Sequence, residues 1–177
     1  AEGGETLAAP FDVLDAGRMG VFRDPAGAVF AIWQKGSHRG FLTDMGEPGA
    51  PIWSELSSRD VERAIAFYAE ALGWELRPYD RLPAEQVEEL GYRVIHTAAT
   101  GEQGAGGIQP ISPGLPDEVP SFWLPYFASD DADRDAARIG ELGGSVMVGP
   151  FTVETVGRIV LSSDPQGAWF GLLQPSM

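Results

Sequence analysis

Cysteine is absent from the sequence, so disulfide bridges, a thiolate nucleophile and a cysteine-ligated metal are all excluded. Only two histidines occur, too few for a histidine-rich metal site. Positive charge is scarce as well, because 12 Lys and Arg face 26 Asp and Glu and the formal net charge is −14. Nucleic acid and anionic membrane surfaces would both be repelled, so neither is an expected partner.

Long hydrophobic runs are missing too. No stretch reaches the about 18 consecutive apolar residues of a membrane-spanning helix, and no signal-peptide pattern is visible. We therefore expect a cytoplasmic protein. The sequence does contain 44% hydrophobic residues and five Trp, which is enough for a substantial core.

The stretch 157–174, GRIVLSSDPQGAWFGLLQ, predicts a β-hairpin. Two apolar runs flank the turn Asp164-Pro165-Gln166-Gly167. In such a turn Asp bonds to the backbone two residues on, Pro pre-sets φ, and Gly takes a conformation that a Cβ atom would disfavour. The same pattern occurs at 17–34, as GRMGVFRDPAGAVFAIWQ, at a constant offset of 140 residues.

This match extends upstream of the hairpin and covers residues 1–37 against 141–177, which we call the N-terminal copy and the C-terminal copy. Of the 37 pairs, 13 are identical, whereas chance would give roughly two or three at background residue frequencies. The sequence therefore contains a duplication. The repeated residues of the N-terminal copy are Gly3, Gly4, Pro10, Phe11, Val13, Gly17, Arg18, Asp24, Pro25, Gly27, Ala28, Phe30 and Gln34.

Hydrophobic periodicity predicts two βαβββ units in tandem, over 51–113 and 120–177, which together form one domain, 51–177. In the first unit, Ser58 is expected to cap a helix over 59–72 that Gly73 ends. The second unit has its helix at 131–142. The predicted strands are 51–57, 74–79, 92–98, 106–111, 122–128, 145–148, 158–162 and 168–173, with a short helix over 83–90.

Residues 1–37 correspond only to the second half of such a unit, because the strand and helix that begin the C-terminal unit have no counterpart before them. We expect an incomplete βαβββ unit of an N-terminal domain, joined by a Gly-rich linker over 38–50. Two explanations stay open. The natural protein is longer at its N-terminus, or this half unit borrows a strand and helix from another copy, which would give a homodimer.

The helix ending FYxxxLGW (Phe67, Tyr68, Leu72, Gly73, Trp74) and the repeated hairpin DPxGAxF resemble the vicinal oxygen chelate superfamily. Its members include glyoxalase I, extradiol dioxygenases, fosfomycin-resistance enzymes and bleomycin-binding proteins, and the doubled hairpin is similar to its two-domain branch. The resemblance implies an α+β fold, the glyoxalase/bleomycin-resistance fold, in which tandem βαβββ units form a cupped mixed sheet with helices outside.

The resemblance also identifies where metal ligands would lie. In the metal enzymes of this superfamily, a His or Gln on the first strand of a unit and a Glu on the last strand hold the ion. The corresponding positions here are Trp53, Leu124, Ala31 and Gly171, none of which binds a divalent metal. We therefore expect a cup with no metal and no cofactor.

Strand alternation predicts the residues that line this cup, while Ile52, Leu56, Phe170 and Leu172 face the helices. The lining is mostly apolar and aromatic with one carboxylate, which suits a flat, partly aromatic small molecule. The expected lining residues are Trp53, Glu55, Ser57, Leu124, Tyr126, Ala128, Trp169, Gly171 and Leu173.

Three functions remain open from the sequence. The favoured one is a metal-free binding protein of the bleomycin-resistance type for an apolar or aromatic small molecule. The second is a lyase, isomerase or oxygenase that uses a metal elsewhere or Glu55 as a general base, because a carboxylate beside Trp has a raised pKa unless it is paired. The third is a structural module whose own side chains fill the cup.

Three further residues have a structural interpretation that competes with a functional one. His96 is a satisfied structural histidine or a ligand donor. Arg18 and Arg158, which begin corresponding strands, are expected to bond loop carbonyls or the turn Asp. Glu55 also has a structural alternative, because it can pair with Arg158 or reach solvent at the rim of the cup.

Overall fold

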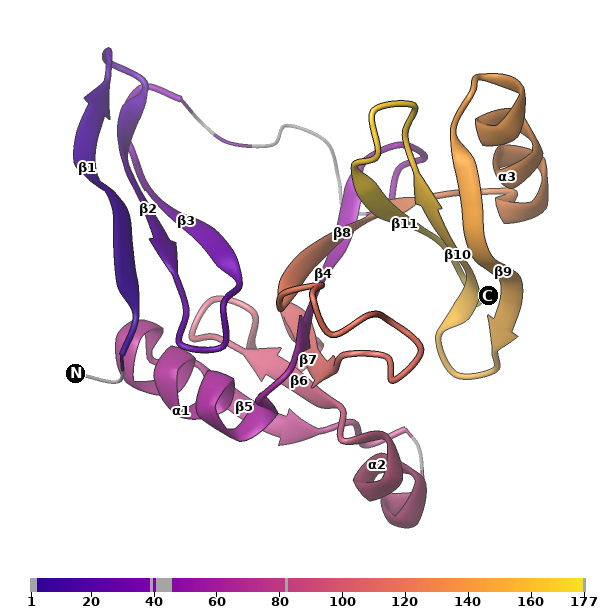
Figure 1. The fold of residues 1–177 in the computed structure, drawn as a ribbon, viewed down its shortest axis with the longest axis horizontal. Helices are drawn as coiled ribbons and strands as arrows, with labels where there is room; N and C mark the ends of the chain where they lie inside the picture. Colours follow the sequence, from indigo (N-terminus) through magenta and orange to yellow (C-terminus); the bar gives the residue numbers. More distant parts are fainter. Residues whose placement is uncertain (1–2, 39, 41–45, 82, 177) are drawn as a thin grey trace. The chain divides into compact units, whose positions relative to one another are not determined.

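The computed structural model describes residues 3–38, 40, 46–81 and 83–176 (Figure 1). The chain forms two compact units. The first contains Ala1–Leu42 and Leu56–Trp123, and the second contains Thr43–Glu55 and Leu124–Met177. Six of the 13 residues of the predicted linker 38–50 lie outside the described residues, as do residues 1–2 of the predicted segment 1–37 and residue 177 of the predicted segment 51–177.

From residue 51 onward the elements follow the predicted βαβββ order twice, and the predicted short helix is present, so the α+β fold class is confirmed. The elements are β1 (Glu5–Val13), β2 (Gly17–Arg23), β3 (Val29–Lys35), β4 (Pro51–Ser58), α1 (Val61–Leu72), β5 (Glu75–Pro78), α2 (Ala84–Leu90), β6 (Arg93–His96), the 3-10 turn η1 (Gly101–Gln103), β7 (Gly106–Pro110), β8 (Phe122–Ala128), α3 (Ala132–Glu141), β9 (Ser145–Val153), β10 (Gly157–Ser163) and β11 (Trp169–Pro175).

The strands belong to two sheets. One has three strands in the order β1-β2-β3, and the other has eight in the order β5-β6-β7-β4-β8-β11-β10-β9. The eight-stranded sheet is mixed, because neighbours such as β10 and β11 are antiparallel whereas β8 and β11 are parallel. The three-stranded sheet is antiparallel. None of the helices among the described residues has the length and apolarity that a bilayer crossing requires.

The start of the first helix differs from the prediction. Ser58 is the last residue of β4, and the N-cap of α1 is Asp60, whose carboxylate accepts a hydrogen bond from the Arg63 amide at 3.1 Å. The Ser58 hydroxyl instead accepts from the Asp60 amide at 3.1 Å. Asp is as good an N-cap as Ser, so the choice depends on where the strand ends. The predicted end is confirmed, because Gly73 has φ 67°.

The predicted hairpin turn is present in both copies. Oδ1 of Asp164 accepts hydrogen bonds from the Gln166 and Ala168 amides at 2.8 and 2.9 Å. In the N-terminal copy, Oδ1 of Asp24 accepts from the amides two and four residues on, both at 2.9 Å. The turn glycines have φ 103° at Gly27 and 87° at Gly167, as the sequence required.

Strand pairing repeats as well. Arg18 lies opposite Gln34 across β2 and β3, and Arg158 lies opposite Gln174 across β10 and β11. The other pairs on this face also correspond at the offset of 140: Gly20 with Ile32 and Phe22 with Phe30, against Val160 with Leu172 and Ser162 with Phe170. The duplicated sequence therefore folds into the same three-stranded arrangement twice.

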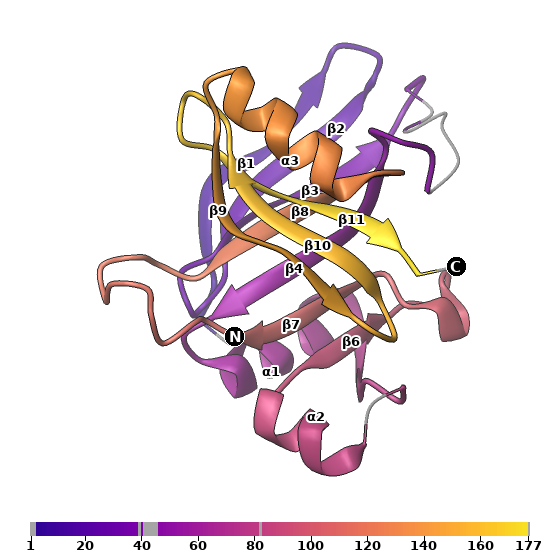
Figure 2. The ribbon, with the colours of Figure 1, turned by 90° about the vertical axis from the view of Figure 1, so that its right-hand side faces the viewer.

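Each unit has its own apolar core. In the second unit, α3 lies across β9, β10 and β11 (Figure 2) and packs Ala132 and Ala136 against Val160, Phe170 and Leu172. The core of the first unit surrounds α1 and includes Ala64, Tyr68, Leu56, Ile95, Ile108 and Ala28. The predictions that Leu56, Phe170 and Leu172 face helices are thus confirmed.

Candidate functional site

Eight of the nine predicted lining residues lie in the second unit on three neighbouring strands. Strand β4 carries Trp53 and Glu55, and the order β4-β8-β11 places the other residues beside them. Their alternation puts them on the face opposite Leu172, which packs under α3. The residues on β8 and β11 are Leu124, Tyr126, Ala128, Trp169, Gly171 and Leu173.

The ninth residue, Ser57, belongs to the first unit and is 7% exposed. Ala128, at the end of β8 in the second unit, is buried as well. These two small residues therefore contribute little accessible surface of their own.

Tyr126 lies at the centre of the predicted face. Its hydroxyl donates a hydrogen bond to Oε1 of Glu55 at 3.0 Å. Its ring covers Gly171, the residue opposite it on β11, so closely that a Cβ at this position would clash with the ring. Glycine is needed here because the ring and the strand come into direct contact.

Burial is graded across this face. Leu124 and Tyr126 are 5% and 6% exposed, so both are buried within this face. Trp53, Glu55, Trp169 and Leu173 are half-buried, so part of each side chain reaches solvent. The arrangement offers a small molecule two indole rings and one hydrogen-bonded carboxylate.

These residues do not fit a divalent metal. The positions that the resemblance assigns to ligands hold Trp53, Leu124, Ala31 and Gly171, and the ring of Tyr126 covers the last of them. Over the residues that the structure describes, no group of three or more His, Asp or Glu is placed to hold an ion. No chemical step is therefore assigned to a metal on this face.

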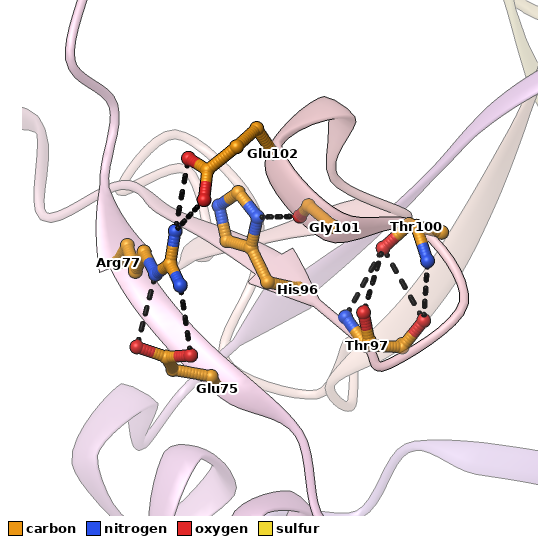
Figure 3. Close-up of polar contacts among 7 residues, drawn as sticks. All are labelled: Glu75, Arg77, His96, Thr97, Thr100, Gly101 and Glu102. Atoms are coloured by element: carbon orange, nitrogen blue, oxygen red, sulfur yellow. Dashed lines mark hydrogen bonds and ion pairs between the residues drawn. The ribbon is translucent and has the colours of Figure 1, made fainter.

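A second polar cluster lies in the first unit, around His96 on β6 (Figure 3). The Nδ1 atom of His96 is 2.7 Å from the carbonyl oxygen of Gly101. Because a carbonyl can only accept, Nδ1 carries the proton in this bond. The side chain is 9% exposed, so the geometry fits the structural interpretation of His96.

Ion pairs surround this histidine. Arg77 makes a two-pronged contact with Glu75 at 2.9 Å and binds both oxygens of Glu102 at 3.1 Å (Figure 3). The hydrogen bond from Arg77 lowers the pKa of Glu75, and the two carboxylates raise the pKa of Arg77. The pairs are solvent-exposed, where such contacts add little stability.

A buried cluster that the sequence did not predict joins the N-terminal copy to α1 within the first unit. The Tyr68 hydroxyl donates to Oδ2 of Asp24 at 3.1 Å and accepts from the Trp123 indole at 3.0 Å. Burial raises the pKa of Tyr68 far above its usual value; the Asp24 carboxylate adds to this and the Trp123 N–H opposes it. In the sequence, the only indication of this cluster was the position of Tyr68, the Tyr of FYxxxLGW, on the apolar stripe of its predicted helix.

The two repeated arginines bind different partners. Arg18 donates to Oδ1 of Asp12 at 2.6 Å and to the Pro10 carbonyl at 2.9 Å, so its partners lie on β1 and not in a loop as predicted. Arg158 binds both oxygens of Asp133, the second residue of α3, at 2.6 and 2.7 Å. Neither arginine contacts the turn Asp, so that part of the prediction is wrong.

Comparison with known proteins agrees with this architecture. A family model described as Glyoxalase/Bleomycin resistance protein/Dioxygenase superfamily matches residues 53–172. A candidate glyoxylase of Mycobacterium bovis, CFP32, is 38% identical over 98% of this chain and 62% of its own length. The anthracycline biosynthesis protein DnrV of Streptomyces peucetius is 37% identical over 97% of this chain and 58% of its own length. The chain thus spans about three fifths of these relatives.

A solved structure shows the same fold at lower identity. The Mn(II)-bound glyoxalase of Novosphingobium aromaticivorans superimposes with a TM-score of 0.56 over 97% of this chain and 55% of its own, at 19% identity. The likeness covers nearly the whole chain, so it includes the N-terminal copy as well as the two βαβββ segments that follow it.

Proposed function

Because the chain belongs to the glyoxalase/bleomycin resistance protein/dioxygenase superfamily, we propose that it binds a small apolar or aromatic molecule without the help of a divalent metal. The binding surface is the strand face of β4, β8 and β11 in the second unit. Trp53 and Trp169 contact the molecule through their rings, Leu124 and Tyr126 form the floor, and Glu55 supplies a polar anchor.

The observation that carries the proposal is the position of Tyr126. Its ring covers Gly171, where a metal ligand of this superfamily would stand, and its hydroxyl is bonded to Glu55. The same side chain therefore closes the metal position, and the aromatic surface that a ligand can reach comes from the half-buried rings of Trp53 and Trp169. Aromatic rings give a flat ligand large contact areas at low entropic cost, because they have few rotatable bonds.

The relatives support the same class of ligand. DnrV and its counterpart DauV are named as anthracycline biosynthesis proteins, and each covers nearly all of this chain at 37% and 35% identity. An anthracycline has a flat, fused-ring core, the shape that two half-buried indoles would contact. An aromatic polycycle is therefore the first ligand to test.

Isothermal titration calorimetry with an anthracycline aglycone tests the proposal, with Trp fluorescence as an independent signal. We expect saturable binding that Trp169→Leu and Trp53→Leu each weaken by about three- to tenfold, because one aromatic contact contributes about 0.5–1.5 kcal/mol. Trp33→Leu is the matched control, since Trp33 is a half-exposed indole on β3 in the first unit. Equal weakening by Trp33→Leu, or no binding by the parent chain, would contradict the proposal.

Metal analysis tests whether the protein lacks a bound divalent metal, as the proposal states. After incubation with Mn(II) and Zn(II) and extensive dialysis, we expect far less than one equivalent of either metal in the protein. A stoichiometric ion would overturn the metal-free assignment while leaving the aromatic contacts open to the titration above.

A second function is supported by one observation, the Tyr126–Glu55 hydrogen bond of 3.0 Å. A carboxylate held by a tyrosine on a ligand-facing surface can act as a general base. In that case Glu55→Gln would abolish turnover of a bound substrate and leave its dissociation constant nearly unchanged. If Glu55 is only an anchor, the same variant weakens binding, so the two functions give opposite results.

A further inference from the structure

The face of the second unit that carries the proposed binding residues continues beyond β11 onto β10. In an antiparallel pair, residues that lie opposite each other point to the same face of the sheet. Leu161 lies opposite Gly171, and Ile159 lies opposite Leu173. Both of these β10 side chains are half-buried. The apolar lining therefore extends past the strands β4, β8 and β11 that the proposed function uses.

Strand β9 adds two apolar side chains to the same face. Val148 lies opposite Leu161, and Phe151 lies opposite Ile159. These two β9 residues share a face because the pairing of β9 with β10 shifts between them. At the shift Gly149 has φ 93°, and a Cβ there would lie 2.6 Å from the Ile159 carbonyl oxygen. The irregular register thus turns both side chains toward the binding face.

The two faces of these strands differ in burial. On one face, Val160 and Leu172 are 0% and 8% exposed, because α3 covers them (Figure 2). On the other face, Val148 is 49% exposed and Phe151 is 38% exposed. Apolar side chains that stay accessible beside a candidate binding surface indicate that this surface continues across them.

The four side chains of β10 and β9 on this face form what we call the apolar strip: Leu161, Ile159, Val148 and Phe151. The carboxylate of the binding face, Glu55, lies on β4, which β8 and β11 separate from β10. A ligand group on the strip must be uncharged, because an ion would lose its hydration there without gaining a partner. Three of the four side chains are aliphatic, which suits a hydrocarbon chain better than a further stacked ring.

Strand spacing sets the size of that chain. Neighbouring strands lie about 4.8 Å apart, so β11, β10 and β9 together span about 10 Å. This is the length of roughly eight carbon atoms in an extended chain.

The strip is too small for a macromolecular partner. Each strand contributes two side chains on this face, which lie about 7 Å apart, so the footprint from β8 to β9 is roughly 100 Å2. A stable protein interface covers about 800 Å2 on each partner. The area therefore favours a chain of a small molecule over a protein or a second copy.

We propose that the ligand of this face is an amphiphile, with an aromatic head at Trp53 and Trp169 and an uncharged hydrocarbon chain along the apolar strip. The inference rests on the proposed function for the head, and it adds the chemical class of the rest of the molecule. A hydroxyl on the head binds Glu55. The chain crosses β10 and ends at β9, the outer strand of the sheet, where Phe151 covers its last carbons.

A homologous series of 6-acyl-2-naphthols, from acetyl to dodecanoyl, tests this proposal on the full chain. Every member has the same hydroxylated aromatic head, and the naphthol fluorescence reports binding. We expect the dissociation constant to fall about twofold for each added methylene, half of the effect of complete burial in free energy, because the strip is open on one side. The gain should stop at roughly eight carbons, where the chain passes the outer strand.

Two valines of β9 provide a matched pair. Val146 is 39% exposed and lies opposite Ser162, on the face that α3 covers, whereas Val148 belongs to the apolar strip. Val148→Ser should weaken binding of the octanoyl compound about fivefold and of the acetyl compound less than twofold. Val146→Ser should leave both within twofold. Circular dichroism checks that both variants are folded.

A third variant removes the end of the strip. Phe151→Ser should weaken binding of the octanoyl compound about tenfold, because it deletes a large apolar contact, and should leave the acetyl compound within twofold. Equal effects of Val148→Ser and Val146→Ser, or no effect of Phe151→Ser, would overturn the proposed chain.

The series distinguishes this inference from the proposed function. If the acetyl compound binds and Trp169→Leu weakens it, but longer chains add nothing, the aromatic head is supported and the hydrocarbon chain is wrong. If no member binds, both proposals are wrong. If analytical ultracentrifugation without ligand shows a dimer that Val148→Ser converts to a monomer, the strip binds a second copy and the proposed chain is again wrong.

Discussion

The two copies of the duplicated hairpin have the same turn and the same register but different neighbours. Asp24 is 3% exposed, because the Tyr68 hydroxyl of α1 covers its second oxygen. Asp164, which makes the same two bonds to turn amides, is only partly buried. At the other end of the hairpin, the C-terminal copy makes the additional contacts. There Arg158 and Gln174 hold α3, whereas Gln34 of the N-terminal copy is exposed.

This comparison separates what a local sequence determines from what tertiary contacts add. The Asp-Pro-x-Gly turn forms in both surroundings because its hydrogen bonds close within five residues. The contribution of the same Asp to stability depends on the groups that would be left unpaired without it. Substitutions at corresponding positions should therefore have unequal effects.

The largest difference in the loss of unfolding free energy is expected between the variants Asp24→Ala and Asp164→Ala. Removing Asp24 leaves one buried amide, one half-buried amide and the Tyr68 hydroxyl without their acceptor, and we expect a loss of about 3 kcal/mol in the free energy of unfolding. Removing Asp164 frees amides that water can reach, for about 1 kcal/mol. Urea unfolding of both variants provides the measurement, and equal losses would show that the burial of Asp24 has no energetic consequence.

Tyr68→Phe should have the next largest effect. The substitution keeps the ring stacked on Trp74 but leaves the Asp24 oxygen and the Trp123 N–H unpaired in a buried place. We expect a loss of about 2 kcal/mol in the free energy of unfolding. Tyr126→Phe is the control, because it removes one hydrogen bond to a half-buried carboxylate and should cost about 1 kcal/mol. A larger effect of Tyr126→Phe would contradict the ranking.

Much of the fold was accessible from the sequence because its signals are local. The turn residues, the αL glycine at Gly73 and the alternation that turns Leu172 toward a helix all act within a few residues. The start of α1 was missed because Ser58 and Asp60 are equally good caps, and only the length of β4 decides between them.

The contacts between distant residues could not be predicted in the same way. The Asp24–Tyr68 bond joins residues 44 apart in the sequence, and no periodicity indicates which turn a helix will cover. On the candidate binding face, alternation placed Glu55, Tyr126 and Gly171 on the same side of neighbouring strands. It could not show that the Tyr126 ring covers Gly171 and that its hydroxyl binds Glu55, because such contacts depend on strand order and rotamer.

The smallest effect is expected where the C-terminal copy holds its helix, and it depends on pH. The hydrogen bond from Arg158 lowers the pKa of Asp133 below its usual value of 3.8. A carboxyl group whose pKa is lowered by folding stabilises the protein above its unfolded pKa, and this contribution disappears as the pH falls through the folded pKa. Arg158→Gln should therefore raise the pKa of Asp133, which an NMR titration of the side-chain carboxyl measures directly.

The same substitution should reduce stability at pH 7 and have little effect at pH 2, where Asp133 is protonated with or without its partner. Arg18→Gln is the matched control, because Arg18 contacts no helix and should leave the Asp133 titration unchanged. If Arg158→Gln leaves the pKa of Asp133 where it was, the ion pair does not hold α3 in solution.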